Sequence, residues 1–290
     1  MGNHFEKKAK KDSSQDKVDR ELDDSDVEDE NRSRSHGEIL KQQVIEGCKT
    51  YDRSPSSILL SSFTAGLEIG FSFLLICTVF SFFSGKLPEE TIFKLTALVY
   101  PMGFILVILG QSILFTEQTS LLTLPVLSKK RSVFSLFRIW GLVITGNIIG
   151  GILMALTLLW IGPRLGIFEA LAVQKIGEHI VDHEIYTILV SAILAGWLMG
   201  LLSWLVTSSR ERIGEIIIIF LITSIMGFTG LHHSIIGNIE VFAGMLVSPE
   251  INFFTYLKTI ITAVIGNAIG GVVFVALLKY RAFVFNITKL

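Results

Sequence analysis

Six long apolar stretches dominate this sequence and leave few choices of fold. Residues 1–53 contain 25 of the 51 charged side chains, and the remaining 237 residues share only 26. Half of all residues are hydrophobic and the mean hydropathy is +0.59, which is typical of transmembrane helices. This pattern excludes a soluble enzyme and a nucleic-acid-binding domain. The two cysteines, Cys48 and Cys77, are too few for a secreted disulfide scaffold.

Two of the six stretches are too long for one straight helix across a bilayer. The stretches are residues 58–83, 93–127, 133–161, 185–206, 216–247 and 253–280. A span needs about 20 residues, whereas the second and fifth stretches exceed 30. Each is interrupted by glycine and polar residues, at 110–119 and at 230–238. The sequence therefore predicts that helices two and five are broken, an arrangement that lines the substrate site in transporters.

Basic residues concentrate on alternate connectors and so predict the orientation in the membrane. The basic side is marked by Lys129, Lys130, Arg131, Arg138, Arg210, Arg212, Lys279, Arg281 and Lys289. The positive-inside rule then places both termini in the cytoplasm. We expect a charged, largely disordered cytoplasmic tail over residues 1–53, with a short amphipathic helix at 38–50, followed by a six-helix transmembrane domain over residues 54–290.

An internal repeat relates the two halves of the membrane domain. The pattern Gly-Asn-x-Ile-Gly-Gly occurs at residues 146–151 and again at 266–271, an offset of 120 residues. The two broken stretches, which begin at Gly110 and Gly230, show the same offset. Each half, about 57–161 and 185–280, contains three spans. Because three is odd, the halves must be inverted relative to each other, which predicts a site near the bilayer midplane between the two breaks.

These motifs together resemble the formate/nitrite transporter family, over about residues 55–285. The resemblance rests on Leu-Phe-Thr-x-x-Thr in the second span, His-Ser in the fifth, the two Gly-Asn-x-x-Gly-Gly motifs, and Ala-Gly-Leu-Glu-Ile-Gly at 65–70. It implies an all-α membrane protein with an aquaporin-like inverted repeat, assembled as a homopentamer with one pore per subunit. It also implies transport of small monovalent weak-acid anions across a bacterial inner membrane.

The resemblance assigns roles to several residues. His233 matches the central histidine of the family, and Thr116 matches the threonine of the broken loop, with Leu114 and Phe115 beside it at a constriction. The sequence departs from the family where Glu117 replaces a glycine, and where Gly237 replaces an asparagine. The complete set that we expect along the pore is Glu68, Leu114, Phe115, Thr116, Glu117, Asn147, His233, Ser234, Gly237, Asn238, Glu240 and Asn267.

Three acidic residues lie at membrane depth, where a charge is costly and is usually neutralised, paired or exposed to a cavity. We predict that Glu117 and Glu240 face the pore, and that Glu68 forms an interhelical hydrogen bond. Ionised Glu117 would repel an anion, so we expect it to be protonated or hydrogen-bonded to His233. In this hypothesis the anion takes up a proton near His233, whose imidazole can titrate near neutral pH, and crosses as a neutral acid.

Other readings of the sequence remain open. We expect no metal, because two histidines with two acids, as in His179 and His183 with Glu178 and Asp182, are a weak signal. We expect no cofactor, no nucleic-acid partner and no enzymatic activity, since no nucleophile–base pair or nucleotide motif occurs. The alternatives to an anion transporter are a pore for small neutral solutes, and a non-conducting scaffold or sensor that acts through its charged tail.

Overall fold

The computed structural model describes residue 17 and residues 34–287 of the chain. This part is all-helical and contains no strand. Most of the predicted disordered tail, residues 1–16 and 18–33, lies outside the described residues, as do residues 288–290. The described residues contain six helices long and apolar enough to cross a membrane, as expected.

The two predicted breaks divide the second and fifth spans into helical segments. The elements are α2 (His36–Tyr51), α3 (Pro55–Phe83), α4 (Glu89–Thr96), α5 (Pro101–Leu109), α6 (Phe115–Leu127), α7 (Val133–Arg164), α8 (Ala170–Val181), α9 (Ile185–Ser208), α10 (Arg212–Thr229), α11 (Ser234–Val247), α12 (Phe253–Ile269), the π-helix η1 (Gly270–Leu277) and α13 (Leu278–Ile287). The broken second span is α4, α5 and α6, and the broken fifth span is α10 and α11. The aquaporin-like inverted repeat with broken helices two and five is thereby confirmed.

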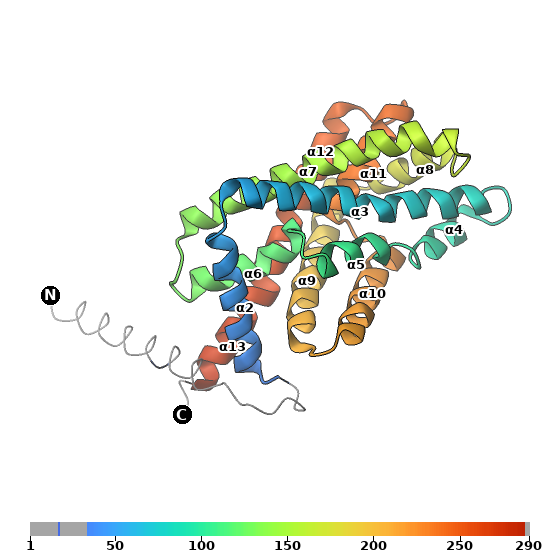
Figure 1. The fold of residues 1–290 in the computed structure, drawn as a ribbon. Helices are drawn as coiled ribbons and strands as arrows, with labels where there is room; N and C mark the ends of the chain where they lie inside the picture. The colour runs from blue at the N-terminus through green and yellow to red at the C-terminus, as the bar shows by residue number, and fades with distance from the viewer. Residues whose placement is uncertain (1–16, 18–33, 288–290) are drawn as a thin grey trace.

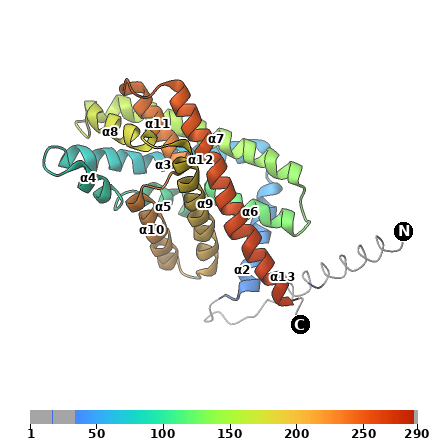
Figure 2. The same ribbon diagram turned by 180° about the vertical axis from the view of Figure 1, so that it is seen from behind.

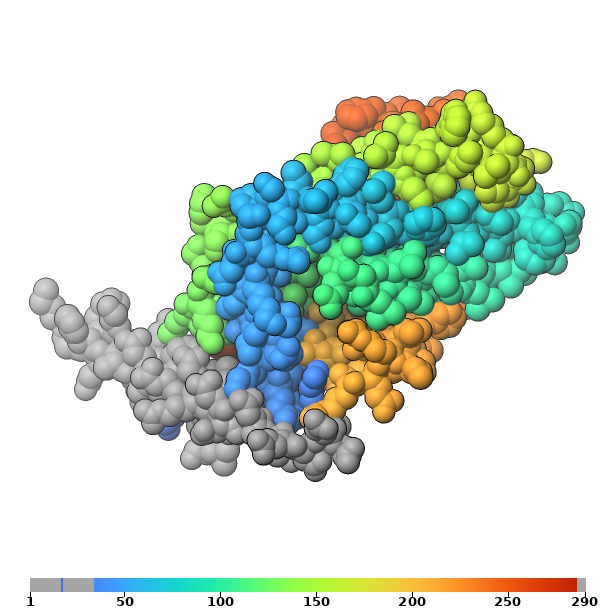
Figure 3. All heavy atoms as spheres, viewed as in Figure 1, coloured from blue at the N-terminus to red at the C-terminus, as the bar shows by residue number. Residues whose placement is uncertain are grey.

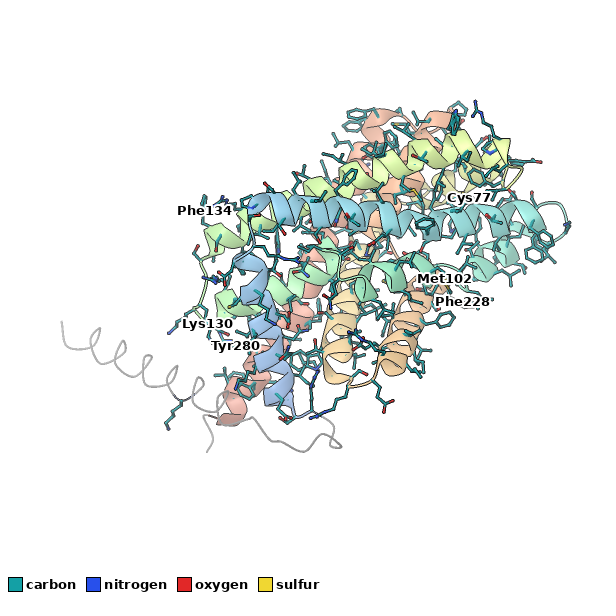
Figure 4. All side chains as sticks on the ribbon, viewed as in Figure 1. Cys77, Met102, Lys130, Phe134, Phe228 and Tyr280 are labelled. Atoms are coloured by element: carbon teal, nitrogen blue, oxygen red, sulfur yellow. The ribbon has the colours of Figure 1, made fainter. Side chains whose placement is uncertain are left out.

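The first and last helices of the bundle have their outer ends on one side of the molecule, as an even number of spans predicts. Figures 1 and 2 show the start of α2 and the end of α13 at the same end of the molecule as the connector between α9 and α10. In Figure 4, Lys130 and Tyr280 lie toward this end, and Phe228 lies away from it. An even number of spans therefore returns the chain to its starting side. We call this side the inner side and the opposite side the outer side.

Glycines allow the long helices of each half to pack with their backbones in contact. A Cβ atom on Gly66 of α3 would lie 2.3 Å from the backbone oxygen of Asn147, and one on Gly150 of α7 would lie 2.2 Å from that of Phe63. The second half repeats this: a Cβ on Gly196 of α9 would lie 2.1 Å from the oxygen of Asn267. Small residues that let backbones approach are the usual means of helix packing in membranes. The repeated motif is therefore a packing motif in both halves.

Two asparagines of the repeated motif hold the two breaks. The Oδ1 atom of Asn147 accepts a hydrogen bond from the backbone N–H of Phe115 (2.8 Å), and its Nδ2 donates to the backbone oxygens of Ser62 (2.7 Å) and Ile113 (2.9 Å). Asn147 is completely buried. One side chain thus joins α3, α7 and both sides of the first break.

Asn267 repeats this geometry in the second half. Its Oδ1 accepts from the backbone N–H of Ser234 (2.8 Å), and its Nδ2 donates to the backbone oxygens of Ala192 (2.8 Å) and His232 (3.0 Å). Backbone groups at a break in hydrocarbon have no water to bond, so a buried amide satisfies them instead. The half-helices α6 and α11 therefore start at fixed positions.

The predicted helix at residues 38–50 is present as α2 and packs against the bundle, along the side shown in blue in Figure 3. Ser35 and Glu38 form a capping box at its start. Gln43 is buried, and its Nε2 donates to Ser203 Oγ (3.1 Å) and Thr207 Oγ1 (2.6 Å) of α9. The Tyr51 hydroxyl donates to the backbone oxygen of Leu122 in α6 (2.9 Å). Since its contacts are with α6 and α9, α2 forms part of the wall on the inner side.

We expect Asn147→Ala to destabilise the protein strongly, because it leaves the Phe115 N–H and the Ile113 carbonyl without their partner in an apolar interior and removes the bond to the Ser62 carbonyl of α3. Loss of these three hydrogen bonds costs about 2–4 kcal/mol. Asn252→Ala is the matched control, since it removes only an exposed helix cap at the start of α12, worth about 1 kcal/mol. Thermal unfolding in detergent measures both. Equal stability of the two variants would contradict the role assigned to Asn147.

We expect Gly150→Ala to lower the apparent Tm by about 5 °C or more, because overpacking of this kind costs about 1–3 kcal/mol. The added methyl group would meet the Phe63 carbonyl, which is backbone and cannot move aside. Gly141→Ala, on the same helix, is the control, because nothing lies within 4 Å of its added Cβ. An unchanged Tm for Gly150→Ala would show that α3 and α7 are less closely packed than described.

Candidate functional site

Two cavities enter the bundle from opposite sides. The outer cavity has a volume of about 220 Å³, and its lining includes Lys94, His179, His183, His233 and Glu240. The inner cavity has a volume of about 520 Å³, and its lining includes Lys49 and Arg53 at the end of α2, Glu117 of α6, and Arg212 of α10. The outer cavity reaches the first residue before α11, and the inner cavity reaches the start of α6. The cavities therefore approach each other at the two breaks.

A contact between Thr116 and His233 separates the two cavities. Thr116 Oγ1 and His233 Nε2 are 2.8 Å apart, and both residues are buried. Thr116 directly precedes Glu117, which lines the inner cavity, while His233 lines the outer one. The barrier between the inner and the outer cavity is therefore this one pair of side chains. The prediction that the two breaks meet near the centre agrees with this geometry.

The surroundings of His233 favour a neutral imidazole. His233 is the N-cap residue of α11, and its Nδ1 accepts hydrogen bonds from the backbone N–H groups of Ile235 (3.3 Å) and Ile236 (3.4 Å). A nitrogen that accepts these bonds carries no proton, so the proton of the neutral ring resides on Nε2. Nε2 then donates to Thr116 Oγ1. The positive end of the α11 dipole acts in the same direction, since it disfavours a cation there.

Apolar side chains surround this contact. Leu114 and Phe115 are completely buried, and Phe115 packs edge-on against Trp140 of α7, with ring centroids 5.7 Å apart. Neither residue belongs to the lining of the two cavities described above. The Phe104 ring of α5 approaches His233 edge-on at 5.1 Å. Phe104 was not predicted, because nothing distinguishes it in sequence from other aromatic residues of an apolar span.

The predicted residues that follow His233 have different surroundings. The backbone N–H of Ser234 is held by Asn267, and its hydroxyl is buried without a hydrogen-bond partner among the described residues. Gly237 lines the outer cavity, and nothing lies within 4 Å of a Cβ built there. Asn238 instead links helices: its Nδ2 donates to the backbone oxygen of Ile148 (3.3 Å), and its Oδ1 accepts from the Tyr256 hydroxyl (2.6 Å).

The three acidic residues at membrane depth lie in three different places. Glu240 is 5% exposed and lines the outer cavity, whereas Glu117 lines the inner cavity. Glu68 lies near the first break, with Oε1 3.6 Å from a Cβ built on Gly110, and its Oε2 has no hydrogen-bond partner among the described residues. The interhelical hydrogen bond expected for Glu68 is therefore not found among these residues. The expected hydrogen bond between Glu117 and His233 is not found, because the imidazole nitrogens are occupied by Thr116 and by the start of α11.

The outer cavity also contains histidines to which the sequence assigned no role in the pore. His232 is held by Ser191 Oγ (2.9 Å) and the backbone oxygen of Ile180 (3.0 Å), as a structural residue would be. His179 stacks on Phe93 at 4.0 Å, and burial lowers its pKa, as does the nearby His183. Among the described residues, no group of three or more His, Cys, Asp or Glu side chains is placed to hold a metal ion.

The polar wall of the inner cavity was also missed by the sequence. Gln43, Glu46, Lys49 and Arg53 all come from α2 or its end, a segment assigned to the tail. A charged segment has no sequence signal that reveals which cavity it faces. The amphipathic pattern at 38–50 was the one available clue.

Comparison with known proteins agrees with this architecture. Residues 37–281 match the family described as formate/nitrite transporter. The chain is 30% identical to the inner membrane protein YfdC of Escherichia coli, over 91% of this chain and 88% of the relative. It is 26% identical to the formate channel BtFdhC of Bacillus thuringiensis, over 85% of this chain and 95% of that one.

Solved structures show the same fold at lower sequence identity. An FNT family ion channel superimposes with a TM-score of 0.76 at 22% identity, covering 84% of this chain and 98% of that one. A pentameric formate channel with formate bound gives a TM-score of 0.68 at 23% identity, covering 79% and 97%. With a family match that spans nearly all of the membrane domain, and with two broken helices whose starts meet at Thr116 and His233, the chain belongs to the formate/nitrite transporter family.

Proposed function

We propose that this protein is a membrane channel or proton-linked transporter for small monovalent weak-acid anions, which pass the constriction as the neutral acid. The observation that carries this proposal is the Thr116–His233 contact, a single neutral hydrogen bond between two cavities that both contain charged side chains. A relative named as a formate channel makes formate the first substrate to test.

The energetics favour a neutral species at this point. Moving an unpaired carboxylate into a low-dielectric interior costs many kcal/mol, whereas the protonated acid loses only its hydrogen bonds to water. Thr116 Oγ1 and His233 Nε2–H can replace those bonds, because one accepts and the other donates. His233 in this role is a hydrogen-bond donor that stays neutral.

The helix starts attract the anion before it is protonated. Both half-helices, α6 and α11, begin at the breaks, so the partial positive charge of each N-terminus lies near the constriction. Lys94 in the outer cavity, and Lys49, Arg53 and Arg212 in the inner one, add positive charge along the route. Glu240 in the outer cavity and Glu46, Glu117 and Glu215 in the inner one oppose this attraction where they are ionised, so an anion is favoured in the cavities where these carboxyls are paired or protonated.

The proposal extends to assembly and placement. The solved structure of a pentameric formate channel supports a homopentamer with one pore in each subunit. The relative named as an inner membrane protein supports a bacterial inner membrane. The basic connectors on the side of both termini support cytoplasmic termini.

Uptake into proteoliposomes tests the transport of weak acids. We expect formate, nitrite, acetate or hydrosulfide to enter faster at external pH 5 than at pH 7.5, because the neutral acid is more abundant at low pH. Empty liposomes measure the leak. Absence of protein-dependent uptake of every one of these anions at both pH values would contradict the proposal and favour a pore for neutral solutes or a scaffold.

Substitutions of His233 test its role as a neutral donor. His233→Asn keeps a helix cap and an uncharged N–H donor, so we expect it to retain uptake within about tenfold of wild type, whereas His233→Ala loses both and falls by about 10²-fold or more. Thr157→Val, an exposed threonine on α7, is a control for surface changes. If His233→Asn were as inactive as His233→Ala, a neutral donor would not be sufficient, and a titrating imidazole would be required.

A further inference from the structure

Among the described residues, one carboxyl group without an ion-pair partner lines the cavity on each side of the Thr116–His233 contact, and the proposed function gives neither a task. Glu240 lines the outer cavity on the same side of α11 as His233, because residues seven positions apart on a helix share a side. Glu117 reaches the inner cavity from the first turn of α6. Neither carboxyl forms a hydrogen bond or ion pair with the described residues, although both lie at membrane depth. Carboxyl groups in such positions mark proton relays or substrate paths.

His233 is poorly placed to protonate a substrate. Its Nδ1 is occupied by the backbone N–H groups of Ile235 and Ile236, and its one proton is engaged with Thr116. Donating this proton would leave an imidazolate, and taking a second would break the cap of α11. If an anion must become a neutral acid at this point, another group has to supply the proton.

We propose that Glu240 and Glu117 form a two-carboxyl proton relay, in which Glu240 protonates the anion in the outer cavity and Glu117 receives the proton in the inner cavity. This inference rests on the proposed function, and it assigns the proton transfer to residues other than the central histidine. The relay works in either direction, because each carboxyl can donate or accept.

The transfer balances at each step. In the outer cavity the O–H bond of the Glu240 carboxylic acid breaks and an O–H bond forms on the substrate carboxylate, which leaves Glu240 ionised and the substrate neutral. Water from the outer side then returns a proton to Glu240. In the inner cavity the substrate acid gives its proton to ionised Glu117, which releases it to water. One anion and one proton cross together, with no net charge.

Titratable groups from several elements lie in and near the outer cavity around Glu240. Cys77 of α3 and Tyr100 before α5 lie near enough to sense its charge. Other titratable or charged groups in this region are His179 and Glu178 of α8, His183, His232, Tyr256 of α12 and Lys94 of α4. Hydrogen bonds from Ser248 and Gln174 lower the pKa of Glu178, which keeps that carboxyl ionised at the rim. Lys94 is the lysine in the wall of the outer cavity. It forms no ion pair with Glu240, so no direct ion pair stabilises the ionised form of Glu240.

More lysine and arginine side chains line the cavity around Glu117 than the cavity around Glu240. Lys49 and Arg53 at the end of α2, and Arg212 of α10, line the same cavity. Lys49 pairs with Glu46 (2.9 Å) and Arg212 with Glu215 (2.8 Å), so their charges are partly compensated. Glu46 and Glu215 offset two of the three cations, and the remaining positive charge stabilises ionised Glu117. The inner carboxyl is thereby suited to accept a proton from the acid and then to lose it.

The test measures formate uptake together with internal acidification, reported by a trapped pH-sensitive dye, in proteoliposomes at external pH 7.5 and pH 5. Wild type should bring in one proton with each formate. Because the relay uses both carboxyls in either direction, each single variant, Glu240→Gln or Glu117→Gln, should lower uptake at pH 7.5 whichever way the protein is inserted in the liposome. The double variant should fall by about tenfold or more. Glu250→Gln, an exposed carboxyl on the outer side, should match wild type.

The pH profile separates the relay from a structural role. The concentration of neutral formic acid in bulk water rises about tenfold for each unit by which the pH falls. At pH 5 the double variant can therefore take up acid that is already protonated, and its rate should recover to within about twofold of wild type. Glu240→Asp keeps the acid, and should exceed Glu240→Gln at pH 7.5 even if the glutamine variant folds poorly. An equal deficit at both pH values, or wild-type rates in the double variant at pH 7.5, would overturn the relay.

Two outcomes distinguish failure of the relay from failure of the proposed function. Coupled uptake of formate and protons that is unchanged in the double variant at pH 7.5 would overturn the relay and leave the proposed function standing, whereas formate uptake without matching acidification would overturn the relay and passage as the neutral acid together. No formate uptake by wild type at either pH, with nitrite, acetate and hydrosulfide also excluded, would overturn both. Coupled uptake that depends on the two carboxyls only at the higher pH would support both.

Discussion

Two buried asparagine side chains fix the geometry on which the site depends. Asn147 and Asn267 each hold the backbone on both sides of a break and tie it to two neighbouring helices. Without them, a helix could end inside hydrocarbon only by leaving polar groups unsatisfied. Each asparagine follows a glycine that lets two helix backbones touch. The hydrogen bonds that hold each break and the close packing of the helices therefore come from one motif. The repeat therefore places two helix starts face to face near the centre of the molecule.

The neutral character of the constriction follows from this placement. A histidine at a helix start accepts backbone N–H groups on one nitrogen and must donate with the other, which here leads to Thr116. The ring cannot easily gain or lose a proton in that position. Cavities with charged side chains on both sides and an uncharged hydrogen bond between them favour a species that is charged in the cavities and neutral in passage. The acidic residues in the two cavities are then the groups available for proton transfer.

The sequence predicted the architecture well and the contacts of the site only in part. Hydropathy, basic connectors and the 120-residue repeat depend on local composition and spacing, so the six spans and the two breaks could be read directly. The family resemblance brought His233 and Thr116 together correctly. The bond between Asn238 and Tyr256, the contact of Phe104 with His233, and the inner cavity wall formed by α2 depend on packing between distant segments. Of the two alternatives expected for Glu117, the hydrogen bond to His233 is not found, because backbone N–H groups occupy Nδ1 of the imidazole and Thr116 occupies Nε2.

The dependence of uptake on membrane potential tests the central claim most directly. Formate uptake by wild-type proteoliposomes would be measured at equal pH on both sides while a potassium diffusion potential is set at different values. If the acid crosses neutral, with its proton, the initial rate should not change with the potential. A bare anion would gain or lose about 2.3 kcal/mol for each 100 mV, so a rate that follows the potential would contradict neutral passage between Thr116 and His233.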